Sequence, residues 1–197
     1  MTTQTEPKLA APGAGLPAIE LFFGRLFFAL RRWFGTRDSF TARFQQERQA
    51  ISTLVRSCDS ESGMRRVLIR RLSGLEDSSR NWSVWMTLDH LRIVHLDFIR
   101  VIGALTNGII PEGKASTAAV KPSPETSAEV VAAYEKSCDD LLSTVAAAPN
   151  LNTAVRFAHP WFGPLDAAGW HALAGGHMGI HRLQIERILQ GIPAAKQ

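Results

Sequence analysis

Apolar residues recur every three or four positions along most of the chain, which is the spacing of one face of an α-helix. This spacing predicts helices over residues 38–57, 62–75, 83–106 and 126–147. A last helix is expected to begin after Asp166, its predicted N-cap, and to end near Gly191. Prolines in residues 109–125 predict a loop, and no stretch alternates apolar and polar residues as a half-buried strand would. The pattern therefore indicates an all-α protein.

Helices of this length, joined by short or proline-rich loops, favour an antiparallel four-helix bundle. The 197 residues suffice for one domain with an appendage. We assign residues 36–191 to the bundle and residues 16–35 to an extra N-terminal amphipathic helix. Residues 1–15, which are polar and punctuated by Pro and Gly, are expected to be a disordered tail, and residues 192–197 a C-terminal tail.

Residues 16–35 are rich in phenylalanine and arginine. Four charged side chains interrupt their apolar run and argue against a helix that spans a bilayer: Glu20, Arg25, Arg31 and Arg32. Two interpretations remain open. The helix packs on the bundle or on a second subunit, as amphipathic helices commonly do, or it lies on the surface of an anionic membrane.

Charge and cysteine content narrow the class of function. The net charge is +4, and its excess lies in residues 1–80, which carry 13 basic and 8 acidic side chains. This excess is small, and no helix-turn-helix, zinc finger or basic-aromatic stripe accompanies it, so nucleic-acid binding is not expected. Two cysteines, Cys58 and Cys138, make no disulfide framework and indicate reduced thiols in a cytoplasmic protein.

Three of the six histidines are candidate metal ligands. His177 and His181 are four residues apart, so their rings project from one helix face about one turn apart. His90 lies on the most apolar predicted helix, and across the bundle it would complete a three-histidine site with open positions for water or substrate. The alternatives are that His177 and His181 are exposed surface residues and that His90 is a core residue with a polar partner.

The C-terminal helix gives the histidine pair its context. Trp170, Ala174, His177, His181, Gln184 and Ile188 fall on one broad stripe. If that stripe faces the core, each imidazole needs a polar partner there, and one metal ion satisfies both. The glycines of this helix, Gly175, Gly176 and Gly179, weaken it or allow another helix to pack closely.

Two motifs resemble the DinB-like metal-binding helical bundles. The first is Asn81-Trp82-Ser83-Val84 followed by Thr87-Leu88-Asp89-His90-Leu91. The second runs from His159-Pro160-x-Phe162-Gly163-Pro164-Leu165 through Trp170 to His177-x-x-x-His181-x-x-Gln184-Ile185. The resemblance covers residues 60–190, whereas the phenylalanine-rich segment has no counterpart in it. Ile180 stands where many members of the group have arginine.

The resemblance implies a four-helix bundle that binds one divalent metal through His90, His177 and His181. Zinc or nickel is the expected metal, with iron or manganese as alternatives. Relatives include S-transferases that use bacillithiol or mycothiol and a mycothiol-dependent maleylpyruvate isomerase. A small-molecule substrate, a low-molecular-weight thiol and a homodimer are therefore expected. Gln184, Asp89, Trp170 and His159 are candidates for orienting a metal ligand or a substrate, and no catalytic residue is assigned.

Two function hypotheses follow. In the first, the chain is a metal-dependent thiol S-transferase or hydrolase that acts on a small electrophile. In the second, it is a non-catalytic interaction module, its metal site is structural or vestigial, and residues 16–35 make contact with a membrane surface or a second subunit.

Overall fold

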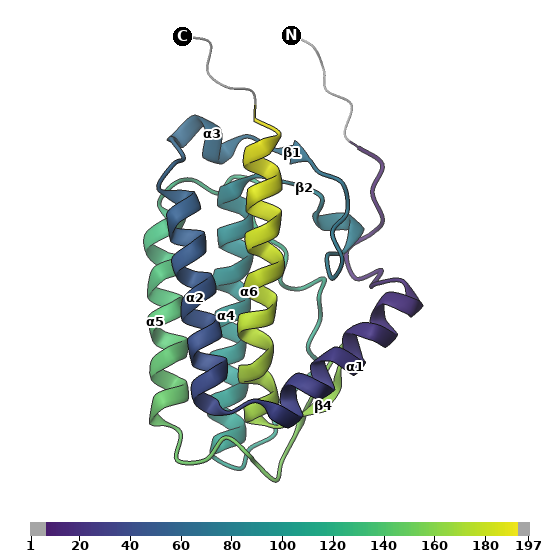
Figure 1. Ribbon diagram of the computed structural model, residues 1–197, viewed down its shortest axis with the longest axis vertical. Helices are drawn as coiled ribbons and strands as arrows, with labels where there is room; N and C mark the ends of the chain where they lie inside the picture. The colour runs from purple at the N-terminus through teal and green to yellow at the C-terminus, as the bar shows by residue number, and fades with distance from the viewer. Residues whose placement is uncertain (1–6, 193–197) are drawn as a thin grey trace.

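A computed structural model describes residues 7–192 and shows four long helices side by side (Figure 1). These are α2 (Arg37–Val55), α4 (Val84–Thr106), α5 (Val130–Ala147) and α6 (Ala167–Gln190). A further helix, α1 (Ala18–Phe34), leans away from the bundle at one end. The predicted all-α class and four-helix bundle are confirmed.

Contacts along α4 and α6 show that these two helices run in opposite directions. His90 lies against His177, whereas Phe98, two turns further along α4, lies against Trp170 near the start of α6. Because α4 and α6 face each other in this way, the two motifs of the sequence come together in the middle of the bundle.

Two other neighbouring pairs are parallel. Thr41 of α2 contacts His171, and Glu47, further along α2, contacts Arg182, so α2 and α6 share a direction. The loop over residues 107–129 carries the chain back to the end of the bundle where α4 starts (Figure 1), and α5 then runs alongside α4. The bundle is antiparallel between these two pairs and parallel within each.

Side-chain caps explain where the helices begin. The Asp166 carboxylate accepts a hydrogen bond from the Gly169 amide at 2.8 Å, as predicted for the N-cap of α6. Ser83 caps α4 in the same way through the Met86 amide. α2 begins with a capping box between Thr36 and Ser39.

The core lies between the four helices and is filled with large apolar side chains. The largest are less than 2% exposed and come from all four helices: Phe44, Ile51, Leu88, Leu91, Ile102, Leu105, Tyr134, Leu141, Trp170, Met178, Ile185 and Ile188. Their burial is the main source of the bundle's stability, at about 1.5–3 kcal/mol per large side chain.

The helix predicted over residues 62–75 is wrong. The chain forms a short helix, α3 (Ser60–Met64), and then the strand β1 (Val67–Leu68), which pairs with β2 (Asn81–Trp82); a 3-10 turn, η1 (Asp77–Ser79), lies between the strands. Apolar spacing in this stretch matches a helix, but pairing with residues 80–82 outweighs it. Gly74 then turns the chain with a positive φ of 83°.

A second two-stranded sheet precedes α6. β3 (Phe157–His159) pairs with β4 (Gly163–Leu165), and His159 lies opposite Gly163. This hairpin carries the His-Pro-x-Phe-Gly-Pro-Leu motif and places it beside α1. The sequence did not predict either sheet, because strands of two or three residues are too short to show an alternating pattern.

Residues 10 and 13 are attached to the body of the protein. The Ala10 amide donates a hydrogen bond to Asp77, and the Gly13 amide donates one to Glu76. A tail that is disordered over all of residues 1–15, as predicted, would not make these bonds. Residues 1–6 and 193–197, which include most of the predicted C-terminal tail, lie outside the described residues.

The α6 glycines let α2 approach closely. A Cβ atom on Gly175 would lie 3.1 Å from the Phe44 backbone nitrogen, and one on Gly179 would lie 3.1 Å from Glu47 Oε1. Gly176, in contrast, faces open space. Of these three glycines of α6, Gly175 and Gly179 therefore serve close helix packing.

Within residues 7–192, no helix combines the length and apolar character needed to cross a membrane.

Candidate metal centre

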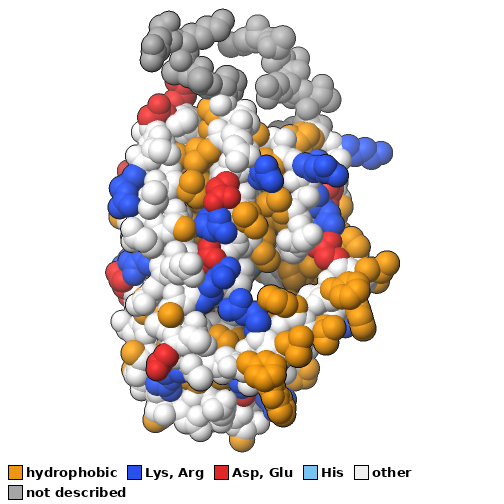
Figure 2. All heavy atoms as spheres, viewed as in Figure 1, with side chains coloured by type: hydrophobic (Ala, Val, Ile, Leu, Met, Phe, Trp, Pro, Cys, Tyr) orange, Lys and Arg blue, Asp and Glu red, His pale blue; other side chains and the backbone are white. Residues whose placement is uncertain are grey.

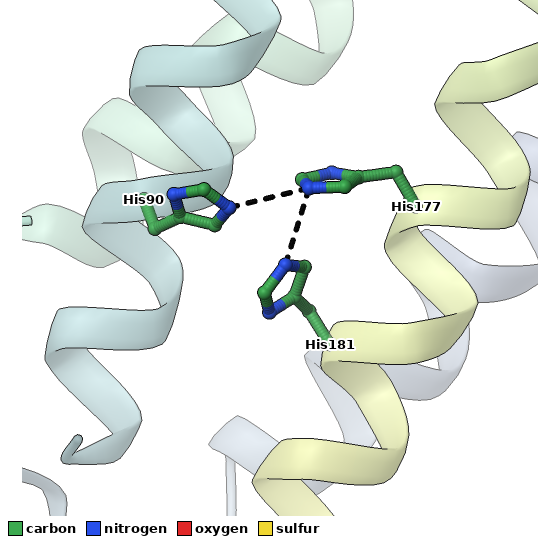
Figure 3. A group of neighbouring side chains, drawn as sticks. All are labelled: His90, His177 and His181. Atoms are coloured by element: carbon green, nitrogen blue, oxygen red, sulfur yellow. Dashed lines mark hydrogen bonds between the residues drawn. The ribbon is translucent and has the colours of Figure 1, made fainter. Parts of the chain in front are cut away.

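Three imidazole rings meet between α4 and α6 (Figure 3). His90 projects from α4, and His177 and His181 project from successive turns of α6. Nε2 of His177 lies 3.2 Å from Nε2 of His90 and 3.1 Å from Nε2 of His181. One ring nitrogen from each residue lies within 4.8 Å of the other two, a spacing at which the three could hold a single metal ion. The structure thus brings together all three predicted ligands.

A backbone carbonyl fixes the tautomer of His90. Its Nδ1 lies 2.6 Å from the carbonyl oxygen of Val120, which can only accept a hydrogen bond. Nδ1 therefore carries the proton, and in the neutral ring Nε2 presents a lone pair to the other two histidines.

Gln184 does the same for His181. Its Oε1 lies 2.7 Å from His181 Nδ1, while its Nε2 donates to the Ser79 carbonyl at 2.8 Å. Because the amide nitrogen is used by Ser79, the oxygen accepts the proton on His181 Nδ1. The lone pair of His181 Nε2 therefore also points into the cluster.

These tautomers fit a metal ion. Two lone pairs converge on His177 Nε2, and this nitrogen carries at most one proton, which can satisfy only one of them. His177 Nδ1 is buried and meets no hydrogen-bond partner among residues 7–192. Hydrogen bonds between the rings thus leave one acceptor unsatisfied, whereas a cation bound by all three Nε2 atoms would satisfy each lone pair.

Burial keeps the rings neutral, which is the form that binds metals. Loss of hydration lowers the pKa of His90 to about 4. Loss of hydration and the neighbouring imidazoles hold the pKa values of His177 and His181 well below the ordinary range. At neutral pH the three residues are therefore uncharged.

Aromatic side chains surround the cluster. The Trp82 ring is stacked on His181 at 6.2 Å and lies 5.1 Å from the His90 ring. Phe98 lies 6.4 Å from His177. These rings shield the imidazoles from water and restrict their rotation.

The three histidines line a cleft that is partly open to solvent. Its other walls come from η1 and the turn before it, the loop over residues 115–121, and the β3–β4 hairpin. Open clefts of this kind, lined by apolar side chains and a few polar groups, are typical of small-molecule sites.

Two of the four candidate orienting residues lie beside this space, and one does not contact the histidines. Trp170 and His159 both line the cleft, with ring centroids 5.4 Å apart. Asp89 instead pairs with Arg92 at 2.8 Å and accepts from the Ser123 amide at 3.0 Å. Asp89 therefore anchors the loop that carries Val120 and does not bond an imidazole.

His95, His171 and both cysteines lie apart from the cluster. His95 contacts Ser137, and His171 contacts Thr41. Burial raises the pKa of the Cys138 thiol to about 12 and also raises that of Cys58. Neither cysteine lines the cleft, so no protein thiolate is present beside the three histidines in the described part of the chain.

Sequence reasoning missed the loop groups that orient the histidine side chains. Val120 and Ser79 act through backbone carbonyls, which leave no mark on residue type. Lys121 lies between them, and its ammonium donates to Glu76 at 3.0 Å and to Ser79 at 3.0 Å. Only the lysine, a charged side chain in a loop with few of them, offered any signal.

Comparison with known proteins agrees with this fold. The sequence profile of the DinB superfamily matches residues 43–185, which is more than half of the chain and includes all three histidines. The four-helix bundle protein TT2238, known from a crystal structure, is similar in fold, with a TM-score of 0.57 and 23% sequence identity over 77% of this chain and 98% of its own. No curated protein matches the chain. This chain belongs to the DinB superfamily.

Proposed function

We propose that the chain binds one divalent metal ion through Nε2 of His90, His177 and His181. The observation that carries this proposal is the convergence of two ring nitrogens with fixed lone pairs on a third imidazole in a buried site. Zinc or nickel is the proposed metal, with iron and manganese as the alternatives, although imidazole ligands suit zinc, nickel and iron alike. Three protein ligands leave a coordination position for a small molecule, as in catalytic sites.

We further propose that the cleft catalyses a thiol S-transfer or a hydrolysis on a small electrophile. A metal ion in this position supplies a Lewis acid that lowers the pKa of a coordinated thiol or water. A thiol nucleophile must come from outside the chain, since Cys58 and Cys138 are protonated and lie away from the cleft. A low-molecular-weight thiol or water fits this requirement.

The chain's own residues orient the imidazole rings and exclude water from the site. Val120 and Gln184 hold the protons of His90 and His181 on the ring atoms that face away from the cluster. Trp170 lines the cleft and Trp82 packs against His90 and His181, so both present apolar surface beside the histidines. No residue of the cleft is assigned as a general base, and these residues position the reactants.

Metal content tests the first proposal directly. Purified untagged protein, reconstituted with zinc, nickel, iron or manganese and then desalted, should retain about one ion per chain by elemental analysis. His90→Ala and His181→Ala should each lose it. His171→Ala removes a buried imidazole from the same helix but outside the cluster, and it should keep the metal. Circular dichroism confirms that each variant is folded.

No retained metal in the native chain, or full retention in both ligand variants, would overturn the metal site. If the metal is retained, a screen of the loaded protein with thiols and electrophiles, beside His90→Ala, tests turnover. Turnover that persists at the native rate in His90→Ala contradicts the catalytic proposal but leaves the binding proposal standing.

A further inference from the structure

The outward side of α1 is an unbroken stripe of large apolar side chains. Its eight members are 50–83% exposed: Ile19, Phe22, Phe23, Leu26, Phe27, Leu30, Trp33 and Phe34. At about 100° per residue they fall within an arc of about 140° that contains no charged residue. Figure 2 shows the resulting ridge of hydrophobic atoms along α1. Exposed apolar patches of this extent mark interaction surfaces.

The opposite side of α1 is already attached to the protein. Phe28 packs on Phe162 with ring centroids 4.7 Å apart, and Arg25 donates to the Trp161 carbonyl at 2.6 Å. Arg32 pairs with Asp166 at 2.6 Å. A surface helix normally turns its apolar face inward and its charges outward. In α1 arginines reach inward, and the wider apolar face is left for something outside this chain.

The width of the stripe argues against a second copy of α1 as its occupant. Two paired helices bury a narrow seam, which is less than the full arc of about 140°. Packing centred on Leu26 and Leu30 would leave the aromatic rings on both flanks, Phe22 and Trp33 on one side and Phe27 on the other, in contact with water. A lipid surface, in contrast, deforms around the helix and contacts the whole arc.

Charge points to the same occupant. Glu20 is the one acidic residue of α1, and it is bound to Arg71 and to the Gly74 amide on the inner side. Arg31 flanks the stripe and lies over the Phe27 ring at 5.9 Å. Aromatic and aliphatic side chains edged by arginine, without a free carboxylate, are typical of helices that lie in the headgroup region of anionic bilayers.

We propose that α1 is an interfacial helix that docks the protein on the surface of an anionic lipid bilayer. The inner side of α1 contacts Trp161 and Gly74, which both line the cleft. Docking through α1 therefore brings the cleft close to the bilayer. The proposal does not depend on metal binding, because α1 lies outside the residues that match the DinB superfamily.

Vesicle flotation of the full chain tests the proposal. The protein should float with vesicles of phosphatidylcholine and phosphatidylglycerol, and less with phosphatidylcholine alone. The double variant Phe23→Glu/Phe27→Glu should bind at least about tenfold more weakly, because each glutamate places a charge in the apolar stripe. The matched control is Ile109→Glu/Ile110→Glu, which changes two residues of similar exposure, 59% and 58%, outside α1. The control should bind like the native chain.

Trp33 offers a second readout. It is 83% exposed, whereas Trp82, Trp85 and Trp170 are buried and Trp161, on the inner side of α1, is half-buried. Its fluorescence should shift to shorter wavelength on mixing with anionic vesicles, and Trp33→Phe should lose most of that shift while it still floats.

Three results would overturn the proposal. The first is absence of flotation with either kind of vesicle, and the second is an equal loss of binding in the control variant. The third is a native dimer, seen by light scattering, that dissociates in Phe23→Glu/Phe27→Glu while neither protein binds vesicles. That result would assign the stripe to a second copy of the chain.

Discussion

Gln184 Oε1 lies 2.7 Å from His181 Nδ1, and this contact decides which nitrogen of His181 faces the other two histidines. The amide of Gln184 is itself oriented by the Ser79 carbonyl, 105 residues earlier in the chain. A residue one turn after the last proposed ligand thus connects that ligand to the loop that closes the other side of the cleft.

Replacing Gln184 with leucine should weaken metal binding more than it harms the fold. The His181 ring would lose the acceptor that fixes its tautomer, and losses of this kind lower metal affinity by about 10–100-fold. The unfolding free energy should fall by about 1–3 kcal/mol, because the buried Ser79 carbonyl loses its donor. Competition with a chelator measures the affinity, and urea denaturation measures the stability.

Gln184→Glu separates these two effects. A carboxylate still accepts from His181 Nδ1 but offers no donor to Ser79 and adds a buried charge. We expect this variant to keep its metal affinity while it loses stability. Equal affinity in Gln184→Leu and the native chain would show that the Gln184–His181 contact does not orient a ligand.

Acid should destabilise the metal-free protein before carboxylates begin to titrate. Burial lowers the pKa of all six histidines from an ordinary value of 6.5, to about 4 for His90 and to about 3 for His95. The unfolded chain therefore binds more protons than the folded chain between pH 4 and 6.5. The contribution of the neutral, buried histidines to the unfolding free energy is complete above pH 6.5 and is lost as the pH falls toward 4.

Urea denaturation in the presence of a chelator, at pH 7.5 and at pH 5.5, checks this prediction. The midpoint should be lower at pH 5.5, and His171→Asn should show a smaller difference between the two pH values. The pKa of His171 is lowered to about 4 by burial, and the residue lies outside the cluster, so its removal subtracts one buried imidazole. Equal midpoints at both pH values would contradict the assignment of neutral, buried histidines.

The α6 glycines differ in what an added methyl group would meet. Gly176→Ala places Cβ in open space and should raise the unfolding free energy by up to about 1 kcal/mol, because alanine is the better helix former. Gly175→Ala gains the same propensity, but its Cβ meets the Phe44 backbone nitrogen at 3.1 Å, and a backbone atom cannot easily move. Overpacking costs about 1–3 kcal/mol, so this variant should be less stable than Gly176→Ala.

Thermal or urea denaturation of the two variants gives the comparison, and the native chain is the reference. Stabilisation of equal size in both would show that α2 does not approach α6 as closely as the structure indicates. The pair is well matched, since both positions lie in the middle of α6 and neither is a proposed ligand.

The sequence predicts the long helices and the three histidines because both leave local signals. α4 and α6 show sustained helical spacing, and His177 and His181 are one turn apart on the same helix. The turns and strands over residues 65–82 are set by pairing between segments that are distant in sequence, and the apolar spacing there matches a helix equally well. The directions of the helices depend on the path of the loop over residues 107–129. The apolar spacing of a sequence carries no information about that path.

The groups that orient the histidine rings divide in the same way, into those with a local signal in the sequence and those without one. Gln184 could be proposed because it lies one turn from His181 on a predicted helix. The Val120 carbonyl could not, because any residue supplies a carbonyl and 30 positions separate it from His90. Asp89 was proposed from its position beside His90, but adjacent helical residues point about 100° apart, and its carboxylate reaches Arg92 and the loop instead.

Lys121 is expected to hold the loop that carries the Val120 carbonyl. Its ammonium lies 3.0 Å from Glu76, whose carboxylate is buried and also accepts from Thr117 at 2.8 Å. Burial alone would raise the pKa of Glu76, but the hydrogen bonds from Lys121 and Thr117 outweigh it and hold this pKa below its ordinary value. Lys121→Met leaves the carboxylate without its cation and should cost about 2–4 kcal/mol of unfolding free energy at pH 7.

The double variant Lys121→Met/Glu76→Gln removes the charge and keeps an acceptor for Thr117, so it should recover most of the lost stability. The pH dependence gives an independent check. A lowered pKa in the folded protein stabilises it above pH 4.5 and loses that effect as Glu76 is protonated in acid. The deficit of Lys121→Met relative to the native chain should therefore shrink as the pH falls toward 4. A deficit that is the same at pH 7 and pH 4, and that the double variant shares, would show that Lys121 stabilises the loop by packing and not by pairing with Glu76.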